Sequence, residues 1–112
     1  FVEMVRSNYR KMKSAGVRLI ASTDAGIFRV YHHDLPKALP EFARFAELSP
    51  VETLRAATSD CAAAIDLGSV TGRISPGFSA DFVVYESNPL ENLAVLEAPV
   101  LVVARGQEIN PV

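Results

Sequence analysis

The sequence predicts an α/β chain in which helices surround one buried strand, followed by a final third made of β-structure. Two observations carry this prediction. Apolar residues recur at helical spacing as far as residue 68, and short apolar runs bounded by Gly and Pro follow it. Residues 17–21 form the early strand, because they are apolar except for Arg18. A chain with this order of elements would be an α+β fold if it stood alone.

The composition limits the classes of protein to which this chain can belong. The chain has 112 residues, enough for one domain or part of one, and 49% hydrophobic with 21% charged residues indicates a globular fold. A net charge of −2 provides no basic surface for nucleic acid, and no apolar run is long enough to cross a membrane. Cys61 is the single cysteine, which favours a reducing, cytoplasmic location. Residue 1 is Phe, so either the initiator was removed or the chain begins inside a longer one.

Three helices are expected in the first 68 residues. Apolar residues at helical spacing predict one over about 2–14, with Gly16 as its stop. Asp34 can cap the next, which carries Pro36 in its first turn and is kinked or delayed by Pro40. A capping box at residues 49–52 starts the third, which is predicted to run from 50 to about 66 with Gly68 as its stop.

The last third of the sequence is predicted to form strands joined by turns. Residues 81–85 and 99–104 are the two strong strand candidates, and Gly106-Gln107 looks like the turn into a short final strand at 108–109. Residues 88–96 are expected to form a loop or a short helical turn.

The residues that could carry chemistry are few. Asp24 follows the predicted strand, at the end where α/β proteins place catalytic groups, although an acid before Ala-Gly is most often a turn residue. His32 and His33 lie on the loop that follows. Adjacent histidines on an extended loop point in opposite directions, so they are not expected to chelate one metal ion. They are either polar loop residues, or one of them contacts a substrate.

Several ordered stretches resemble the amidohydrolase superfamily, the metal-dependent (β/α)8-barrel hydrolases, and within it the imidazolonepropionase- and prolidase-like branch. Residues 16–26 resemble the eighth barrel strand, and residues 48–58 resemble the helix after the barrel. Residues 72–84 resemble the G-x-I-x-x-G-x-x-A-D stretch that re-enters a small β-sandwich. Residues 88–90 and 102–106 fit the usual ending. The resemblance therefore implies a last βα unit of the barrel in residues 1–68 and sandwich strands in residues 69–112.

The same resemblance gives Asp24 a role. In this family the acid after the eighth strand is a metal ligand, and it also takes a proton from the metal-bound water and delivers it to the leaving group. The family's His-x-His, its bridging Lys or Glu and its two later histidines are absent from these 112 residues. A catalytic zinc needs about three protein ligands. The chain alone is therefore expected to hold no catalytic metal and to show no activity.

The function expected from the resemblance is that of the C-terminal part of a hydrolase that cleaves an amide, cyclic amide or dipeptide C–N bond. The parent would use a divalent metal, zinc before others, and a small-molecule amide or peptide substrate. The bare strand edges and apolar faces of such a part predict self-association. Two alternatives stay open: a small α+β binding or assembly module without catalysis, and a hydrolase of ester, phosphoester or C–Cl bonds.

Overall fold

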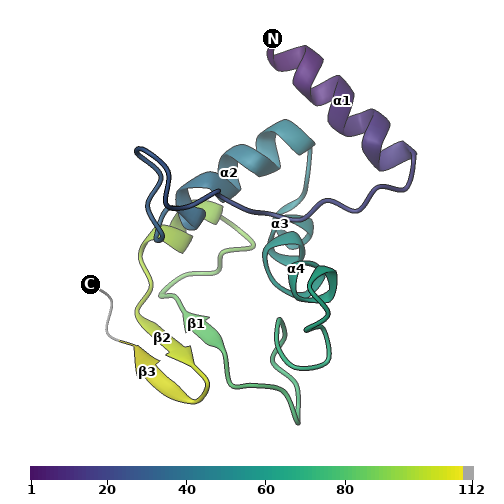
Figure 1. Cartoon of the computed structure of the whole chain (residues 1–112). Coiled ribbons are helices and arrows are strands. Elements are labelled where there is room, and N and C mark those ends of the chain that lie inside the picture. The colour runs from purple at the N-terminus through teal and green to yellow at the C-terminus, as the bar shows by residue number, and fades with distance from the viewer. Residues whose placement is uncertain (110–112) are drawn as a thin grey trace.

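A computed structural model of the chain describes residues 1–109 as helices followed by a small sheet (Figure 1). The last three residues of the predicted 69–112 segment lie outside the described residues. The elements in chain order are helices α1 (Val2–Ser14), α2 (Leu35–Ala46), α3 (Pro50–Ala57) and α4 (Ser59–Ala64), strand β1 (Phe82–Val84), 3-10 helix η1 (Leu93–Glu97), and strands β2 (Leu101–Ala104) and β3 (Gln107–Ile109). No helix within residues 1–109 has the length and apolar character needed to cross a bilayer.

The first two predicted helices are confirmed. α1 ends where Gly16 takes a φ of +78°, a left-handed conformation that glycine adopts without steric cost. Asp34 is the N-cap residue of α2, but its side chain does not cap that helix. Its Oδ2 atom instead accepts a hydrogen bond of 2.7 Å from the N–H of Tyr31, so this carboxylate holds the preceding loop against the start of α2.

The buried strand predicted over residues 17–21 is wrong for this chain. Residues 17–24 adopt no regular structure, and Val17 and Ile20 are 49% and 42% exposed. A strand exists only through hydrogen bonds to a neighbouring strand, and residues 1–109 offer none at this place. Ala21 alone of the segment is buried, and its N–H donates to the carbonyl of Ala56 in α3.

The helix predicted over residues 50–66 is divided into α3 and α4. The capping box is present, since Ser49 and Glu52 exchange hydrogen bonds between side chain and backbone. The break comes at Thr58, which has a φ of −127° and a ψ of −93° and whose hydroxyl donates to the carbonyl of Leu54. α4 ends at Ala64, and Asp66, with a φ of 61°, takes the left-handed position expected of Gly68.

The predicted strands form one antiparallel sheet of order β1-β2-β3. Val83 faces Val102 across the first pair, and Val103 faces Glu108 across the second. β1 and β2 are shorter than the runs at 81–85 and 99–104 that predicted them, whereas β3 begins at Gln107, one residue earlier than predicted. The fold is therefore a small α+β arrangement with a three-stranded sheet.

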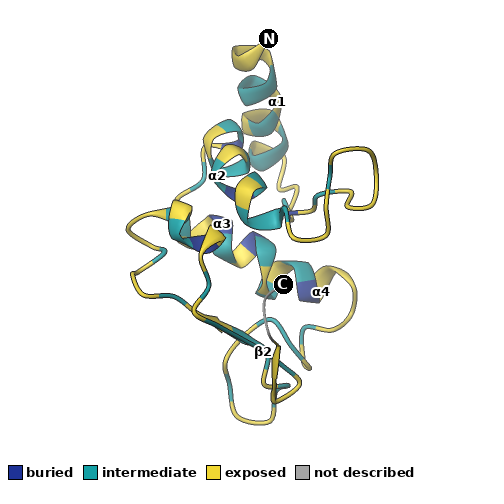
Figure 2. Ribbon diagram, turned by 90° about the vertical axis from the view of Figure 1, so that its left-hand side faces the viewer, coloured by how far each residue is buried: buried dark blue, intermediate teal, exposed yellow. Residues whose placement is uncertain are grey.

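The core is small and lies among α2, α3 and η1 rather than on the sheet. Ala21, Leu39 and Leu96 form it, with side chains such as Phe42 and Leu54 packed against them. Figure 2 shows the same distribution, with buried residues on the helices and only exposed or intermediate residues along the sheet.

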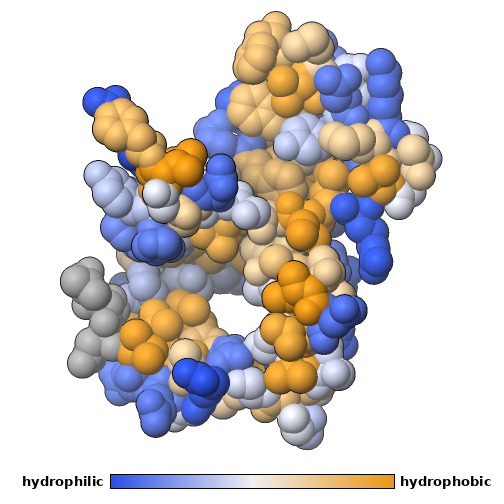
Figure 3. All heavy atoms as spheres, in the orientation of Figure 1, coloured by the Kyte–Doolittle hydropathy of each residue, from blue (hydrophilic) through white to orange (hydrophobic). Residues whose placement is uncertain are grey.

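A cavity of about 1090 Å³ separates α3 and α4 from β1. Its walls are mainly apolar and include Leu54, Cys61, Ile65, Phe82 and Val84. Figure 3 shows an opening between the helices and the sheet, with hydrophobic side chains along its sides. The apolar faces that would normally meet in a core thus remain apart within the described part of the chain.

Gly72 lies in the turn after α4 and packs directly against that helix. It has a φ of +95°, and a Cβ there would lie 2.8 Å from the Cβ of Ala62. Gly77 has a similar φ of +83° with nothing within 4 Å of a Cβ. We expect Gly72→Ala to lower the free energy of unfolding by about 1–3 kcal/mol more than Gly77→Ala, because only the first also overpacks a contact. Urea denaturation of both variants measures this, and equal losses would show that the contact relaxes freely.

Candidate functional site

Asp24 lies at the start of the loop that joins the segment after α1 to α2. Its side chain is exposed, and its φ of 56° is left-handed, a conformation that few residues other than glycine, asparagine and aspartate adopt. No side chain or backbone N–H within residues 1–109 donates a hydrogen bond to its carboxylate. An exposed carboxylate with its oxygens free can accept a proton or bind a cation.

The two predicted histidines diverge in the structure. A Cβ on Gly26 would lie 3.9 Å from Cε1 of His32, so the His32 ring sits against the loop backbone two residues from Asp24. The ring of His33 stacks on Tyr31, with 5.5 Å between centroids and 4° between planes. Its Nε2 atom is 3.9 Å from Oδ1 of Asp34. His32 therefore lies next to Gly26 in the loop that contains Asp24, and His33 lies beside Tyr31 and Asp34 before α2.

Asp34 is the main electrostatic anchor of this loop. The N–H of Tyr31, followed by the ammonium of Lys37 at 3.2 Å, holds the pKa of the Asp34 carboxyl below its usual value. The carboxylate therefore stays ionised over the physiological range, and it fixes both ends of the segment from Tyr31 to Lys37.

A tight turn at residues 27–30 was not apparent in the sequence. The N–H of Val30 donates to the carbonyl of Ile27 at 3.1 Å, and the N–H of Gly26 donates to the carbonyl of Val30 at 3.0 Å. Arg29, third in the turn, has a φ of 64°. Such a position favours Gly or Asn, so the turn carries no sequence signal that could have indicated it.

The residues present do not by themselves fit a catalytic metal ion. No three His, Cys, Asp or Glu side chains within residues 1–109 gather closely enough to hold one. A catalytic zinc takes about three protein ligands, and Asp24 supplies a single carboxylate.

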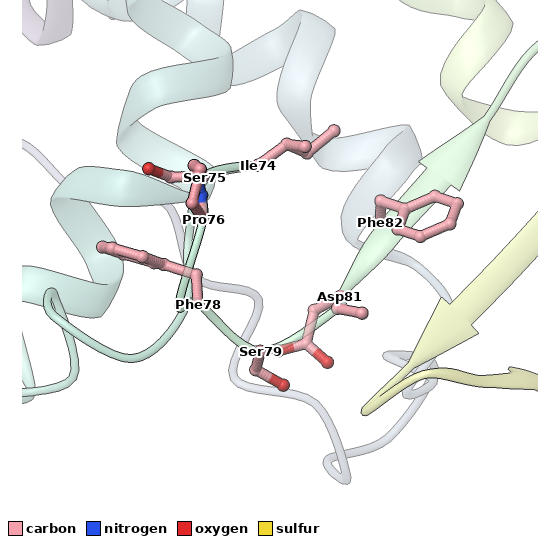
Figure 4. A pocket seen from close by; sticks show the side chains of 8 residues that line it. Ile74, Ser75, Pro76, Phe78, Ser79, Asp81 and Phe82 are labelled. Carbon is pink, nitrogen blue, oxygen red and sulfur yellow. The ribbon is translucent and has the colours of Figure 1, made fainter.

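A second cavity, of about 250 Å³, lies within the segment of residues 74–82 (Figure 4). Asp81 is the only ionisable side chain in its lining, and Figure 4 shows it beside Ser79. Its Oδ1 accepts from the N–H of Arg105 at 2.7 Å, and its Oδ2 accepts from the hydroxyl of Thr71 at 2.6 Å. The carboxylate thus ties the turn after α4 to the β2–β3 hairpin, and its role here is structural.

The bond from Thr71, and then that from Arg105, hold the pKa of Asp81 below its ordinary value of 3.8. Because the folded-state pKa is the lower one, the ionised form stabilises the fold above pH 3.8, and this contribution is lost as the pH falls through the folded-state pKa. We expect wild type to exceed Asp81→Asn in free energy of unfolding at about pH 6, with a smaller difference at about pH 3. A difference that does not change with pH would mean that the charge of Asp81 plays no part.

Comparison with known proteins places this chain beside one group of enzymes. Residues 3–109 match the model of the amidohydrolase family. The chain is 36% identical over 75 residues to an imidazolonepropionase of Chloroflexus aggregans (strain MD-66 / DSM 9485), covering 67% of this chain and 18% of that protein.

Solved structures named as prolidases or a dipeptidase also superpose on this chain. A protein from Bifidobacterium longum, provisionally named a prolidase, superposes with a TM-score of 0.86 at 35% identity over 93% of this chain and 26% of that one. A prolidase complexed with N-methylphosphonate-L-proline superposes with a TM-score of 0.80 at 27% identity, over 93% and 26% of the two chains. A Xaa-Pro dipeptidase with methionine in its active site gives 0.76 at 25%, over 95% and 25%. The chain therefore spans about a quarter of the length of the structures it matches.

Proposed function

The chain belongs to the amidohydrolase family, and from this premise we propose that it is the C-terminal part of a metal-dependent hydrolase that cleaves a C–N bond. The match over residues 3–109 is the observation that carries the proposal, because it includes the Asp24 loop and the sheet in one alignment. The relatives named as a prolidase and an imidazolonepropionase favour an amide, cyclic amide or dipeptide as substrate.

In this proposal the Asp24 carboxylate is both a metal ligand and the group that carries the proton to the leaving nitrogen. Its exposure and its unoccupied oxygens support the assignment. The metal, zinc before other divalent ions, would supply Lewis-acid activation of the reacting groups. The remaining ligands would come from other parts of the parent protein, because the described residues bring no further ones to Asp24.

We assign His32, ahead of His33, to contact with the substrate. The His32 ring lies next to Gly26, two residues after Asp24, whereas the His33 ring stacks on Tyr31 beside Asp34. This choice narrows the sequence prediction, which left the two residues equal.

The proposed division of the parent fold follows the change of structure along the chain. Residues 1–68 would complete a barrel, with residues 17–21 becoming its last strand once neighbouring strands are present. Residues 69–112 would join a small β-sandwich. The cavity between α3, α4 and β1, and exposed apolar side chains such as Val17 and Ile74, leave room and surface for such neighbours. The same surfaces support self-association when the chain stands alone. We propose a cytoplasmic location for the parent, since Cys61 is a free thiol.

The chain by itself is expected to hydrolyse no dipeptide or lactam, because Asp24 lacks partner ligands. The test compares the purified 112-residue chain with the full-length protein that carries it, on a panel of dipeptides and cyclic amides, with and without chelator. Hydrolysis by the full-length protein alone, lost on chelation, would support the proposal. Chelator-sensitive hydrolysis by the short chain would contradict the missing-ligand argument. A full-length protein inactive on the whole panel would favour the binding module or another bond.

A further inference from the structure

Ala21 is the point at which the segment that leads to Asp24 is attached to the rest of the fold. It is the one buried residue of segment 17–24, with 8% of its surface exposed. Its N–H donates to the carbonyl of Ala56 at 3.0 Å, and no other backbone hydrogen bond within residues 1–109 involves residues 18–25. Asp24 lies three residues after this attachment, so its place depends on how firmly Ala21 is held.

The break in the helix at Thr58 leaves the carbonyl of Ala56 available. In a continuous α-helix over residues 50–66, this carbonyl would accept from the N–H of residue 60. α3 ends instead at Thr58, and the N–H of Ala21 donates to Ala56 from outside the helix. The last carbonyls of a helix need such outside donors. Figure 1 shows the segment after α1 passing beside α3, where this backbone attachment lies.

The side chain of Ala21 is held from a second direction. It clusters with Leu39 of α2 and Leu96 of η1, which are both 5% exposed. α2 and η1 pack against each other, so a segment that follows β1 closes the cluster around Ala21. A methyl group in a close-packed cluster has little freedom to shift, and a void left by a truncated neighbour gives it that freedom.

We propose that Leu96 is a positioning residue for Asp24 and acts through Ala21. This inference rests on the proposed function, in which the Asp24 carboxylate serves the reaction. In the parent, neighbouring strands would hold residues 17–20 along their length, whereas the contacts of Ala21 hold the end nearest Asp24. A shift of about 1 Å in a catalytic group can cost about 100-fold in rate, so a loosened Ala21 should be visible in kcat.

The test uses the full-length protein that carries this chain, with the substrate that wild type hydrolyses best among dipeptides and cyclic amides. Leu96→Ala should lower kcat by about 10- to 100-fold with KM unchanged, because it affects the chemical step rather than substrate binding. Leu96→Met keeps the volume of the side chain and should stay near wild type. In the Asp24→Asn background, Leu96→Ala should cause no further loss of kcat, because the carboxylate that it positions is already absent.

Hydrogen exchange adds a measurement that does not depend on turnover. A peptide covering residues 17–26 should exchange faster in Leu96→Ala than in wild type, because the bond from the Ala21 N–H opens more often. Leu101→Ala is the matched control, since it removes the same atoms from a partly buried position in β2, opposite Val84 and outside the cluster. It should leave both kcat and the exchange of residues 17–26 at wild-type values.

Several results would overturn the positioning role of Leu96 alone. They are an unchanged kcat in Leu96→Ala, an equal loss in the wild-type and Asp24→Asn backgrounds, and an equal loss in Leu101→Ala. Leu96→Val leaves a smaller void and should show the same pattern at reduced size, so it decides the matter if Leu96→Ala does not fold. Full activity of Asp24→Asn, or no hydrolysis by wild type, would instead overturn the proposed function, and this inference with it.

Discussion

Asp24→Asn is expected to lower kcat/KM of the full-length protein by about 10²- to 10⁴-fold, the contribution typical of a general acid–base group. Asparagine keeps the shape of the side chain but cannot accept the proton or carry the negative charge. It also adopts a left-handed backbone readily, so the φ of 56° should be retained and the fold unchanged. Steady-state kinetics and thermal unfolding of the purified variant measure the two effects separately.

Asp66→Asn supplies the control for this variant. Asp66 is likewise an exposed aspartate, with a φ of 61°, and it lies beyond α4 rather than in the Asp24 loop. The same chemical change in the same backbone conformation should leave kcat/KM near the wild-type value. If Asp24→Asn retained full activity with bound metal unchanged, Asp24 would have no catalytic role. It would then be a turn residue, as an acid before Ala-Gly most often is.

Leu39→Ala is expected to lower the free energy of unfolding by about 2–4 kcal/mol. Leu39 is 5% exposed and meets Ala21 and Leu96 at the centre of the small core, so truncation leaves a void there. Alanine is at least as good a helix former as leucine, so α2 itself should not be weakened. Because small folds have little stability in reserve, this loss should be visible as a large shift of the urea midpoint.

Leu90→Ala removes the same atoms from a side chain that is 45% exposed. Its cost should stay below about 1 kcal/mol, because a partly hydrated leucine loses less transfer free energy and leaves no void. Similar losses for the two variants would mean that Leu39, Ala21 and Leu96 do not form a core of their own in solution.

Local signals were enough to predict most of the elements. The helical spacing that ends at Gly16, the capping box at Ser49 and the apolar runs around Val83 and Val102 depend only on neighbouring residues, and each corresponds to an element of the structure. The break at Thr58 was not predictable in this way, because residues 50–66 keep helical spacing across it. The end of α4 was also missed, since an aspartate rather than a glycine takes the left-handed position.

The candidate site shows the same limit. The choice of Asp24 among the acids follows from its place in the order of motifs and stays a prediction, and the family match over residues 3–109 includes this residue. His32 and His33 have different surroundings, and Arg29 takes a left-handed position in a turn whose sequence lacks the Gly or Asn typical of it. Both features depend on contacts across the loop, which the spacing of residues in the sequence does not indicate.

The sequence by itself determined the family, the first two helices and the strands of the small sheet, because these depend on local propensity and on motifs in order. The choice of Asp24 as the acid for chemistry comes from the same motifs and stays a prediction. The tertiary structure alone decided that residues 17–21 form no strand and that the helices and the sheet enclose an open apolar cavity. The physical reason is the same in both cases. A strand needs a partner to satisfy its backbone hydrogen bonds, and an apolar face needs a second face to exclude water, so neither property belongs to a segment alone.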